Sequence, residues 1–208
     1  MSEFLPLFPL NTVVFPGEHL NLHIFEPRYK QLIHDCQQTQ SNFGIPYYQN
    51  SIQDFGTEIK IIETSRLYDN GEMDIKTIGQ RAFELVTFFP KREDKLYAYG
   101  EVSFRNENLS EDQTIRTKIL DYAQQLFQIT GSDVDKLKNK DNTPLSYLLG
   151  HLIALNKEQE FELLKIDNES VRQHYILNHL NTVLPLVEEL ENLKHRIKLN
   201  GHFKSLSL

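Results

Sequence analysis

Proline punctuates the first thirty residues at short intervals, and this limits how the stretch can fold. Short apolar runs alternate there with prolines 6, 9, 16 and 27. Because proline fixes its own φ and has no N–H for a sheet ladder, each one is expected at a strand edge, in a turn or at a helix start. The pattern predicts a short edge strand, a turn at Pro16-Gly17, a strand over 20–24 and a helix opening at Pro27.

Residues 1–108 are predicted to be mostly strand. Leu20, Leu22 and Ile24 recur at every second position, which indicates a sheet with one buried face. The step Asp69-Asn70-Gly71 favours a tight hairpin between strands over 58–67 and 72–78. Further strands are expected over 83–89 and 96–104, and one helix over 27–38 interrupts the series. Many short strands separated by turns are typical of a small barrel or a sandwich.

From Ser110 the period of the apolar residues becomes helical. The spacing from Ser110 to Gln113 is that of a capping box, and Gly131 is expected to end the helix that follows. The polar segment 133–142 is expected to be a connection before a helix restarts at Pro144. Asn156 should cap a short helix, and the pair Asp167-Asn168 should cap the longest one. Pro185 lies inside this last helix and should kink or break it.

Three proline-anchored segments, residues 5–10, 14–17 and 24–29, resemble the N-terminal substrate-binding domain of ATP-dependent Lon proteases. They match the family's L-P-L-F-P-L, V-x-F-P-G and I-F-E-P-R-Y patterns. Residues 55–59 are similar to its G-T step. Residues 77–83 are similar to its T-x-G-x-x-R-F stretch, with Ala82 where a second arginine is usual. The short helix predicted after Asn156 also matches the family's order of elements.

The resemblance implies an α+β fold: a small PUA-like β-barrel with one inserted helix, followed by a C-terminal helical bundle. The expected subdomains are residues 1–108 for the barrel and 109–208 for the helices. The resemblance also implies a non-catalytic module that binds unfolded or peptide segments of proteins, together with an ATP-dependent protease or a chaperone. The ATPase and peptidase domains of full-length Lon proteases cannot be placed in this sequence.

The sequence lacks the motifs that would indicate catalysis. It has no phosphate-binding G-x-x-x-x-G-K-[ST] loop, no G-x-S-x-G elbow and no H-E-x-x-H pair. His19 and His23 would be about 13 Å apart on a strand, and His174 and His179 diverge around a helix, so neither pair suits a metal ion. We therefore expect no enzyme activity, no cofactor and no metal.

Composition narrows the range of partners and the location. The net charge of −7 argues against nucleic acid, which proteins bind with clustered lysine and arginine. No apolar run approaches the roughly 20 residues that span a bilayer, so no membrane partner is expected. The single cysteine, Cys36, excludes an internal disulfide and fits the reducing cytoplasm; we expect it to be an inert helix residue.

Two aromatic doublets are the best candidates for partner contact. Neighbours on a strand point to opposite faces, so each doublet should send one ring away from the core. Exposed rings near a basic residue have the composition of a peptide-binding surface. The predicted contact residues are Tyr47, Tyr48, Phe88, Phe89 and Arg92. The alternative is that the helical half covers these rings.

The cluster around Pro27 is better explained by structure than by ligand binding. Glu26 can cap the helix and Arg28 can pair with a nearby acid, while Tyr29 packs on the barrel.

Peptide binding, in a groove between barrel and bundle lined by apolar side chains, is the leading hypothesis for function. Three alternatives remain open. Nucleic-acid binding through a PUA-like barrel would need a basic face, and a small-molecule enzyme would need titratable groups gathered in one pocket. An oligomerisation or scaffold protein would use the last helix.

Overall fold

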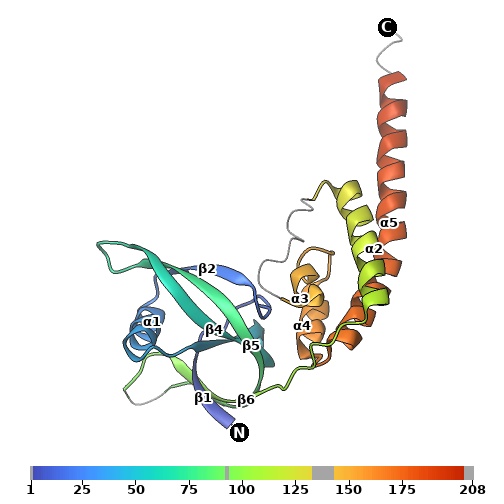
Figure 1. Ribbon diagram of the computed structural model, residues 1–208. Coiled ribbons are helices and arrows are strands. Elements are labelled where there is room, and N and C mark those ends of the chain that lie inside the picture. Colours follow the sequence, from blue (N-terminus) through green and yellow to red (C-terminus); the bar gives the residue numbers. More distant parts are fainter. Residues whose placement is uncertain (1, 92–93, 133–142, 204–208) are drawn as a thin grey trace.

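The computed structural model describes residues 2–91, 94–132 and 143–203, with side chains up to residue 197 (Figure 1). Six strands come first along the chain: β1 (Ser2–Leu7), β2 (His19–Ile24), β3 (Phe43–Gln49), β4 (Ser51–Leu67), β5 (Met73–Phe89) and β6 (Ala98–Phe104). The helices are α1 (Pro27–Thr39), α2 (Gln113–Thr130), α3 (Leu145–Leu149), α4 (Lys157–Lys165) and α5 (Glu169–Phe203). The protein is therefore a mixed α+β structure, as predicted.

The strand pairings form a closed ring. The order is β2-β5-β4-β3-β1-β6, and β6 also pairs with β5, so five strands form a closed ring to which β2 is added beside β5. Strand β1 has neighbours on both sides, since Leu7 pairs with Gly44 of β3 and with Ala98 of β6. The prediction that β1 is an edge strand is wrong. Pro46 in β3 is tolerated because the register shifts next to it, between Pro46 and Tyr48.

Strand β5 is one strand where two were predicted. Its first part pairs with β2 and its last part with β6, while β4 runs along most of its length. Three register shifts interrupt the β4–β5 ladder, and such bulges bend a strand without ending it. Gly79 lies at the middle of β5, where an added Cβ would come within 2.3 Å of the carbonyl oxygen of Phe15. The glycine is required by this close approach and is not a strand break.

Helix α1 begins at Pro27 as predicted. Glu26 occupies the N-cap position, but its side chain makes no capping hydrogen bond. That expectation is wrong, because the Glu26 carboxylate instead accepts a 2.9 Å hydrogen bond from Nε of Arg28. The apolar face of α1 packs against the sheet in a core that includes Leu32, Ile33 and Cys36. Burial raises the pKa of the Cys36 thiol to about 11, which fits the inert role expected of it.

The caps of the later helices agree only in part with the predictions. Asp112, and not Ser110, caps α2 by accepting hydrogen bonds from the N–H groups of Thr114 and Ile115. Asn156 forms the predicted cap, as a complete capping box with Gln159.

The last helix starts where the sequence indicated. The Asn168 side chain accepts a hydrogen bond from the N–H of Val171 at the start of α5. Pro185 does not break α5, which runs on to Phe203. The predicted polar connection over 133–142 lies outside the described residues.

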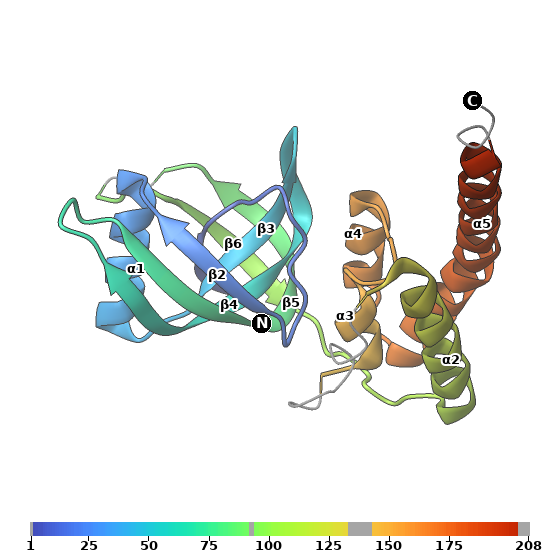
Figure 2. The ribbon, with the colours of Figure 1, turned by 90° about the horizontal axis from the view of Figure 1, so that it is seen from above.

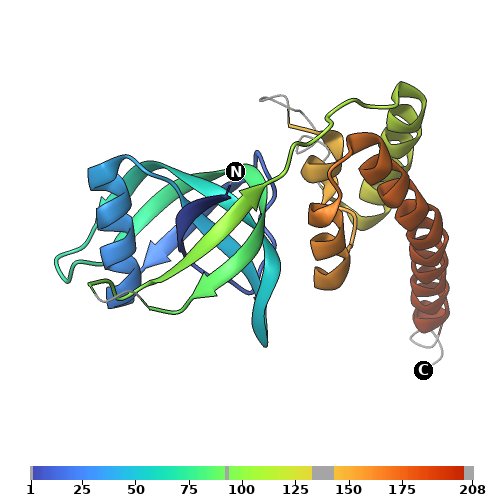
Figure 3. The same ribbon diagram turned by 90° about the horizontal axis from the view of Figure 1, so that it is seen from below.

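The largest apolar core joins the strands to the helices. It contains Phe15 and Tyr47 from the strand half together with side chains from α2, α3, α4 and α5. Figures 2 and 3 show α3 and α4 beside the strands, with α2 and α5 on the far side of them and a single chain segment leading from β6 to α2. Phe15 has no exposed surface and its ring centroid lies 5.4 Å from that of Tyr147 in α3. We refer to this contact region as the junction.

None of the helices in the described part of the chain combines the length and apolar character needed to cross a membrane.

Candidate functional site

The first aromatic doublet divides as the sequence predicted. The ring of Tyr47 is 2% exposed and lies 5.2 Å from the ring of Phe161 in α4, so it belongs to the junction. Tyr48 is 43% exposed. Its backbone N–H donates a 2.8 Å hydrogen bond to the carbonyl of Leu10, and its strand partner across the β3–β4 hairpin is Ile52. Only Tyr48 of this pair can meet a partner.

The second doublet does not divide in this way. Phe88 and Phe89, at the end of β5, are 37% and 40% exposed. They pair with Gly100 and Tyr99 of β6. The prediction of one covered ring is wrong here, because both rings reach the surface. Arg92 lies outside the described residues.

Tyr48 and Phe88 line the same hollow, which we call the aromatic groove. Its volume is about 450 Å³, within the range of ligand sites. Its lining within the described residues consists of Leu7, Pro9, Arg28, Tyr29, Tyr48, Ile52, Phe88, Pro90, Leu96 and Ala98. Most of these side chains are apolar or aromatic, so the groove is suited to apolar side chains of a partner.

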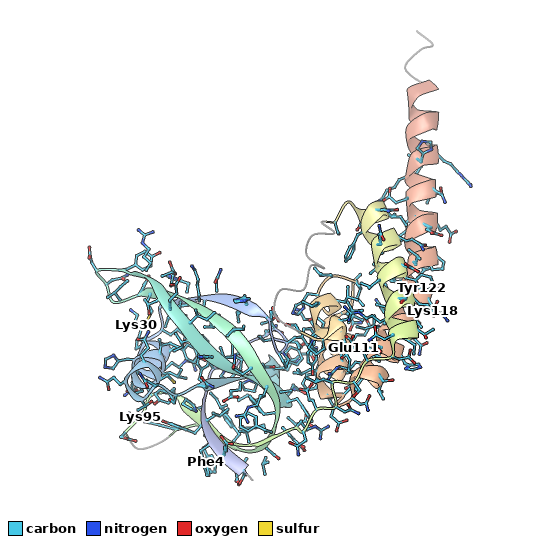
Figure 4. All side chains as sticks on the ribbon, in the orientation of Figure 1. Phe4, Lys30, Lys95, Glu111, Lys118 and Tyr122 are labelled. Atoms are coloured by element: carbon cyan, nitrogen blue, oxygen red, sulfur yellow. The ribbon has the colours of Figure 1, made fainter. Side chains whose placement is uncertain are left out.

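Phe89 lines a second, smaller hollow of about 340 Å³ with Phe4, Lys91 and Tyr99. The rings of Phe4 and Phe89 are 6.2 Å apart. Figure 4 shows Phe4 on β1, at the lower edge of the strand half. The two doublet rings of β5 therefore serve two hollows.

One wall of the aromatic groove is built by the start of α1. The ring of Tyr29 stacks on that of Phe8 at 3.8 Å, and the guanidinium of Arg28 lies 4.5 Å above the centroid of Tyr29. Burial raises the pKa of the Tyr29 hydroxyl, an effect that the Arg28 charge opposes. The structure confirms that Arg28 pairs with a nearby acid, which is Glu26, and that Tyr29 packs on the strand half. It also places Arg28 and Tyr29 in the groove lining.

Leu96, on another wall, is 58% exposed yet firmly positioned. Its N–H donates a 2.8 Å hydrogen bond to the side-chain carbonyl of Gln31 in α1. The next residue, Tyr97, donates its hydroxyl proton to Asp35, and Nζ of Lys95 donates to the same carboxylate at 2.8 Å. Burial would raise the pKa of Asp35, but these two donors outweigh it and the pKa is lowered. Figure 4 shows Lys95 close to α1. The hydrogen bonds of Lys95 and Tyr97 to Asp35 fix the groove wall at Leu96.

A separate cleft lies between the strands and the helices, with a volume of about 320 Å³. Its described lining mixes three charged side chains with polar and apolar residues: Pro16, Gly17, Gly79, Gln80, Arg81, Arg105, Glu107, Leu109, Thr143, Pro144 and Tyr147. Neither aromatic doublet contributes to it. A cleft therefore lies where the sequence predicted a groove, and its lining combines apolar, polar and charged residues. The aromatic groove is a separate hollow on the strand half beside α1.

Comparison with known proteins assigns the family. A sequence model of the ATP-dependent protease La (Lon) substrate-binding domain matches residues 4–182, which is most of the chain. This chain belongs to the Lon substrate-binding domain family. The match begins within β1 and includes β2 to β6, both aromatic doublets and the start of α5. Among curated proteins, no relative is found.

Solved structures of Lon N-terminal domains have the same fold. A Lon N-terminal domain protein from Xanthomonas campestris is 27% identical, with a TM-score of 0.66, over 85% of this chain and 98% of its own. The N-terminal domain of a Lon protease from the Mycobacterium avium complex is 16% identical, with a TM-score of 0.65, over 86% of this chain and 99% of its own. The second likeness concerns the fold alone.

The described side chains of this Lon-family groove offer aromatic faces and a guanidinium to a partner. Among the residues that the structure describes, the titratable groups of its lining are Arg28, Tyr29 and Tyr48. Within the described residues, no group of three His, Cys, Asp or Glu side chains could hold a metal ion. The sequence missed Ile52 and Leu96 as lining residues, because no local pattern relates positions that meet only in the folded sheet.

Proposed function

We propose that this Lon-family domain is a non-catalytic module that binds extended apolar segments of other proteins in the aromatic groove. The observation that carries the proposal is the pair of half-exposed rings, Tyr48 and Phe88, lining one hollow in a chain whose family is defined as substrate-binding. Aromatic rings supply large contact areas at low entropic cost, which favours them at binding surfaces. The neighbouring hollow at Phe89 extends the same surface for a second side chain.

The rigid walls of the groove support this function. Leu96 is held by Gln31, and Tyr29 is stacked on Phe8, so these walls lose little conformational freedom when a peptide binds. We also propose that Phe89 and Arg92 contact the same partner beyond the groove. Tyr47 is left out, since its ring is covered by α4.

We infer that the closed ring of five strands is a PUA-like barrel. We also infer that residues 1–108 and 109–208 form two subdomains joined at the junction. The strands end at Phe104 and the later helices begin at Gln113, which supports this boundary. A cytoplasmic location and a link to an ATP-dependent protease or chaperone fit the family and the single buried thiol.

The test is peptide binding by fluorescence anisotropy, with labelled peptides rich in aromatic and aliphatic residues and polar peptides of equal length. We expect the apolar peptides to bind more tightly. Tyr48→Ala and Phe88→Ala should each weaken binding about 5- to 30-fold, which is the range for an aromatic residue at the centre of an interface.

Phe25→Ala is the matched control, because Phe25 is 58% exposed but does not line the groove. This control should bind like the unmodified protein. Unchanged affinity in both groove variants would refute the assignment of the site. Equal affinity for apolar and polar peptides, or salt-sensitive binding of RNA in their place, would refute peptide recognition.

A further inference from the structure

The second half of α5 projects beyond the other helices and carries an outward apolar stripe. Figures 1 and 4 show this part of α5 extending past the end of α2. Four side chains on it are each more than half exposed: Leu186, Leu190, Leu193 and Ile197. Isolated exposed leucines are ordinary, but four aligned on one helix form a continuous apolar face.

The spacing of the stripe is that of a helix–helix seam. The intervals are four, three and four residues, which keep one face of a helix against a second helix. The stripe is distinct from the residues of α5 that are packed within the chain, which include Leu180 and Leu184. A hollow of about 620 Å³ runs beside the stripe, with Glu189 and Arg196 in its lining.

The charges that flank the stripe are divided along the helix. Glu188, Glu189 and Glu191 lie in its first part, while Lys194 and Arg196 lie in its second part. A second copy of the helix running in the opposite direction would set acidic against basic residues at both ends. A copy running in the same direction would hold the two acidic parts side by side along the axis, and Glu189 could reach only Lys194 of the second copy.

We propose that two copies of this chain associate through an antiparallel contact between their α5 helices. In this contact Leu186 meets Ile197 of the second copy, and Leu190 meets Leu193. Glu189 then lies beside Arg196 of the second copy, and symmetry repeats the pair. The bulk of each molecule lies at the first end of its α5, so an antiparallel arrangement keeps the two bodies apart.

The association is expected to be weak and dependent on concentration. The stripe spans about 18 Å along the helix axis, and the contact buries four apolar side chains from each copy. The surface area buried in this way is far smaller than the roughly 1,600 Å² of a standard stable interface. It is independent of the aromatic groove, since α1 and the projecting part of α5 lie at opposite ends of the molecule in Figure 1.

Sedimentation velocity over a range from micromolar to millimolar protein tests the proposal. The unmodified chain should shift from monomer to dimer across this range. Leu190→Lys should weaken the dimer by about tenfold or more, because it places a charge at the centre of the seam. Leu67→Lys is the control: Leu67 is 70% exposed at the end of β4, and the dimer should be unaffected.

Charge reversal tests the orientation. Glu189→Lys should weaken the dimer about fivefold or more, by opposing two like charges twice over. Adding Arg196→Glu should restore the dimer, whereas adding Lys194→Glu should not, because Lys194 would meet residue 189 only in a parallel pair. A monomer at every concentration, a dimer that survives Leu190→Lys, or rescue by Lys194→Glu alone would overturn the proposal. Binding of α5 to another protein without self-association would overturn it as well.

Discussion

The strand half has two apolar surfaces, one covered by the helices and the other exposed. At the junction, Tyr47 and Phe15 are covered by the helices, whereas Tyr48 and Phe88 remain open in the aromatic groove. Tyr47 and Tyr48 are adjacent in β3, so their different environments come from the two faces of one strand. One face is used for stability, and the other is left available to a partner.

The junction and the aromatic groove also differ in the burial of their charged side chains. The junction encloses Arg172, which has no exposed surface. Its guanidinium donates to the carboxylates of Glu169 and Glu107, both at 2.8 Å, and to the hydroxyl of Tyr147 at 2.7 Å. In the groove, Arg28 stays half exposed and its pair with Glu26 lies at the surface. Buried charge therefore ties elements together at the junction, while the groove depends on apolar contact.

The largest expected effect comes from breaking the junction. Arg172→Met removes the cation and leaves Glu169, which has no exposed surface, with an unpaired negative charge. We expect a loss of about 3–5 kcal/mol in the free energy of unfolding, as for one partner removed from a buried ion pair. Urea unfolding followed by circular dichroism measures it.

Lys76→Met is the control for this variant, because Lys76 pairs with Glu63 and both side chains are about half exposed. The control should lose no more than about 1 kcal/mol. Equal losses in the two variants would show that the Arg172 network does not hold the halves together.

Separate substitution of the two tyrosines sharpens the comparison. Tyr47→Ala opens a cavity against Phe161 and should lower the free energy of unfolding by about 3 kcal/mol. Tyr48→Ala removes an exposed ring and should change stability by no more than about 0.5 kcal/mol. Both variants are tested by thermal unfolding and by the peptide titration. We expect only Tyr47→Ala to lose stability, and only Tyr48→Ala to bind peptide weakly while fully folded. Similar losses of stability would contradict the division of the strand into two faces.

A smaller effect is expected from pH at the edge of the junction. His151 lies between Glu18 of the strand half, at 3.1 Å, and Glu160 of α4, at 2.8 Å. Burial alone would lower the pKa of His151, but hydrogen bonds and charge from Glu18 and Glu160 outweigh it and raise the pKa above 6.5. Its contribution to stability is therefore complete below about pH 6.5 and is lost as pH rises through the folded-state pKa.

Unfolding of the unmodified chain and of His151→Gln, measured from pH 5.5 to 8.5, checks this effect. The difference in stability between the two should be largest at the acidic end and should shrink as pH rises. His23→Gln serves as the control for a surface histidine that also has carboxylate neighbours. A difference that grows with pH would show that His151 is held neutral at the junction.

Local chemistry made much of the fold predictable. Pro27 opens α1, Gly17 with a φ of 83° forms the expected turn, and Asn156 builds a capping box, each because a few neighbouring residues decide the conformation. Predictions that depended on distant neighbours were less reliable. The β1 strand was predicted at an edge although β3 and β6 flank it. Separate strands were predicted over 72–78 and 83–89, although β5 is continuous through Gly79, which the backbone of Phe15 approaches closely.

The candidate site could be predicted only in part from local sequence patterns. The exposed rings of Tyr48 and Phe88 follow from strand alternation and composition, but their meeting in one groove depends on how β3 and β5 are placed around the ring. Leu96 was not predicted as a groove residue, since its position depends on Gln31 and Asp35 of a helix some sixty residues earlier.

The amino-acid sequence by itself determined that a strand half precedes a helical half, the family resemblance and the absence of known catalytic motifs. These depend on dihedral preferences, side-chain periodicity and short motifs, all of which act over a few residues. Only the tertiary structure decided which aromatic rings are covered, where the groove lies and which charges are buried. Burial is a property of the whole packed chain, because a side chain loses its water only when residues far away in the sequence close over it.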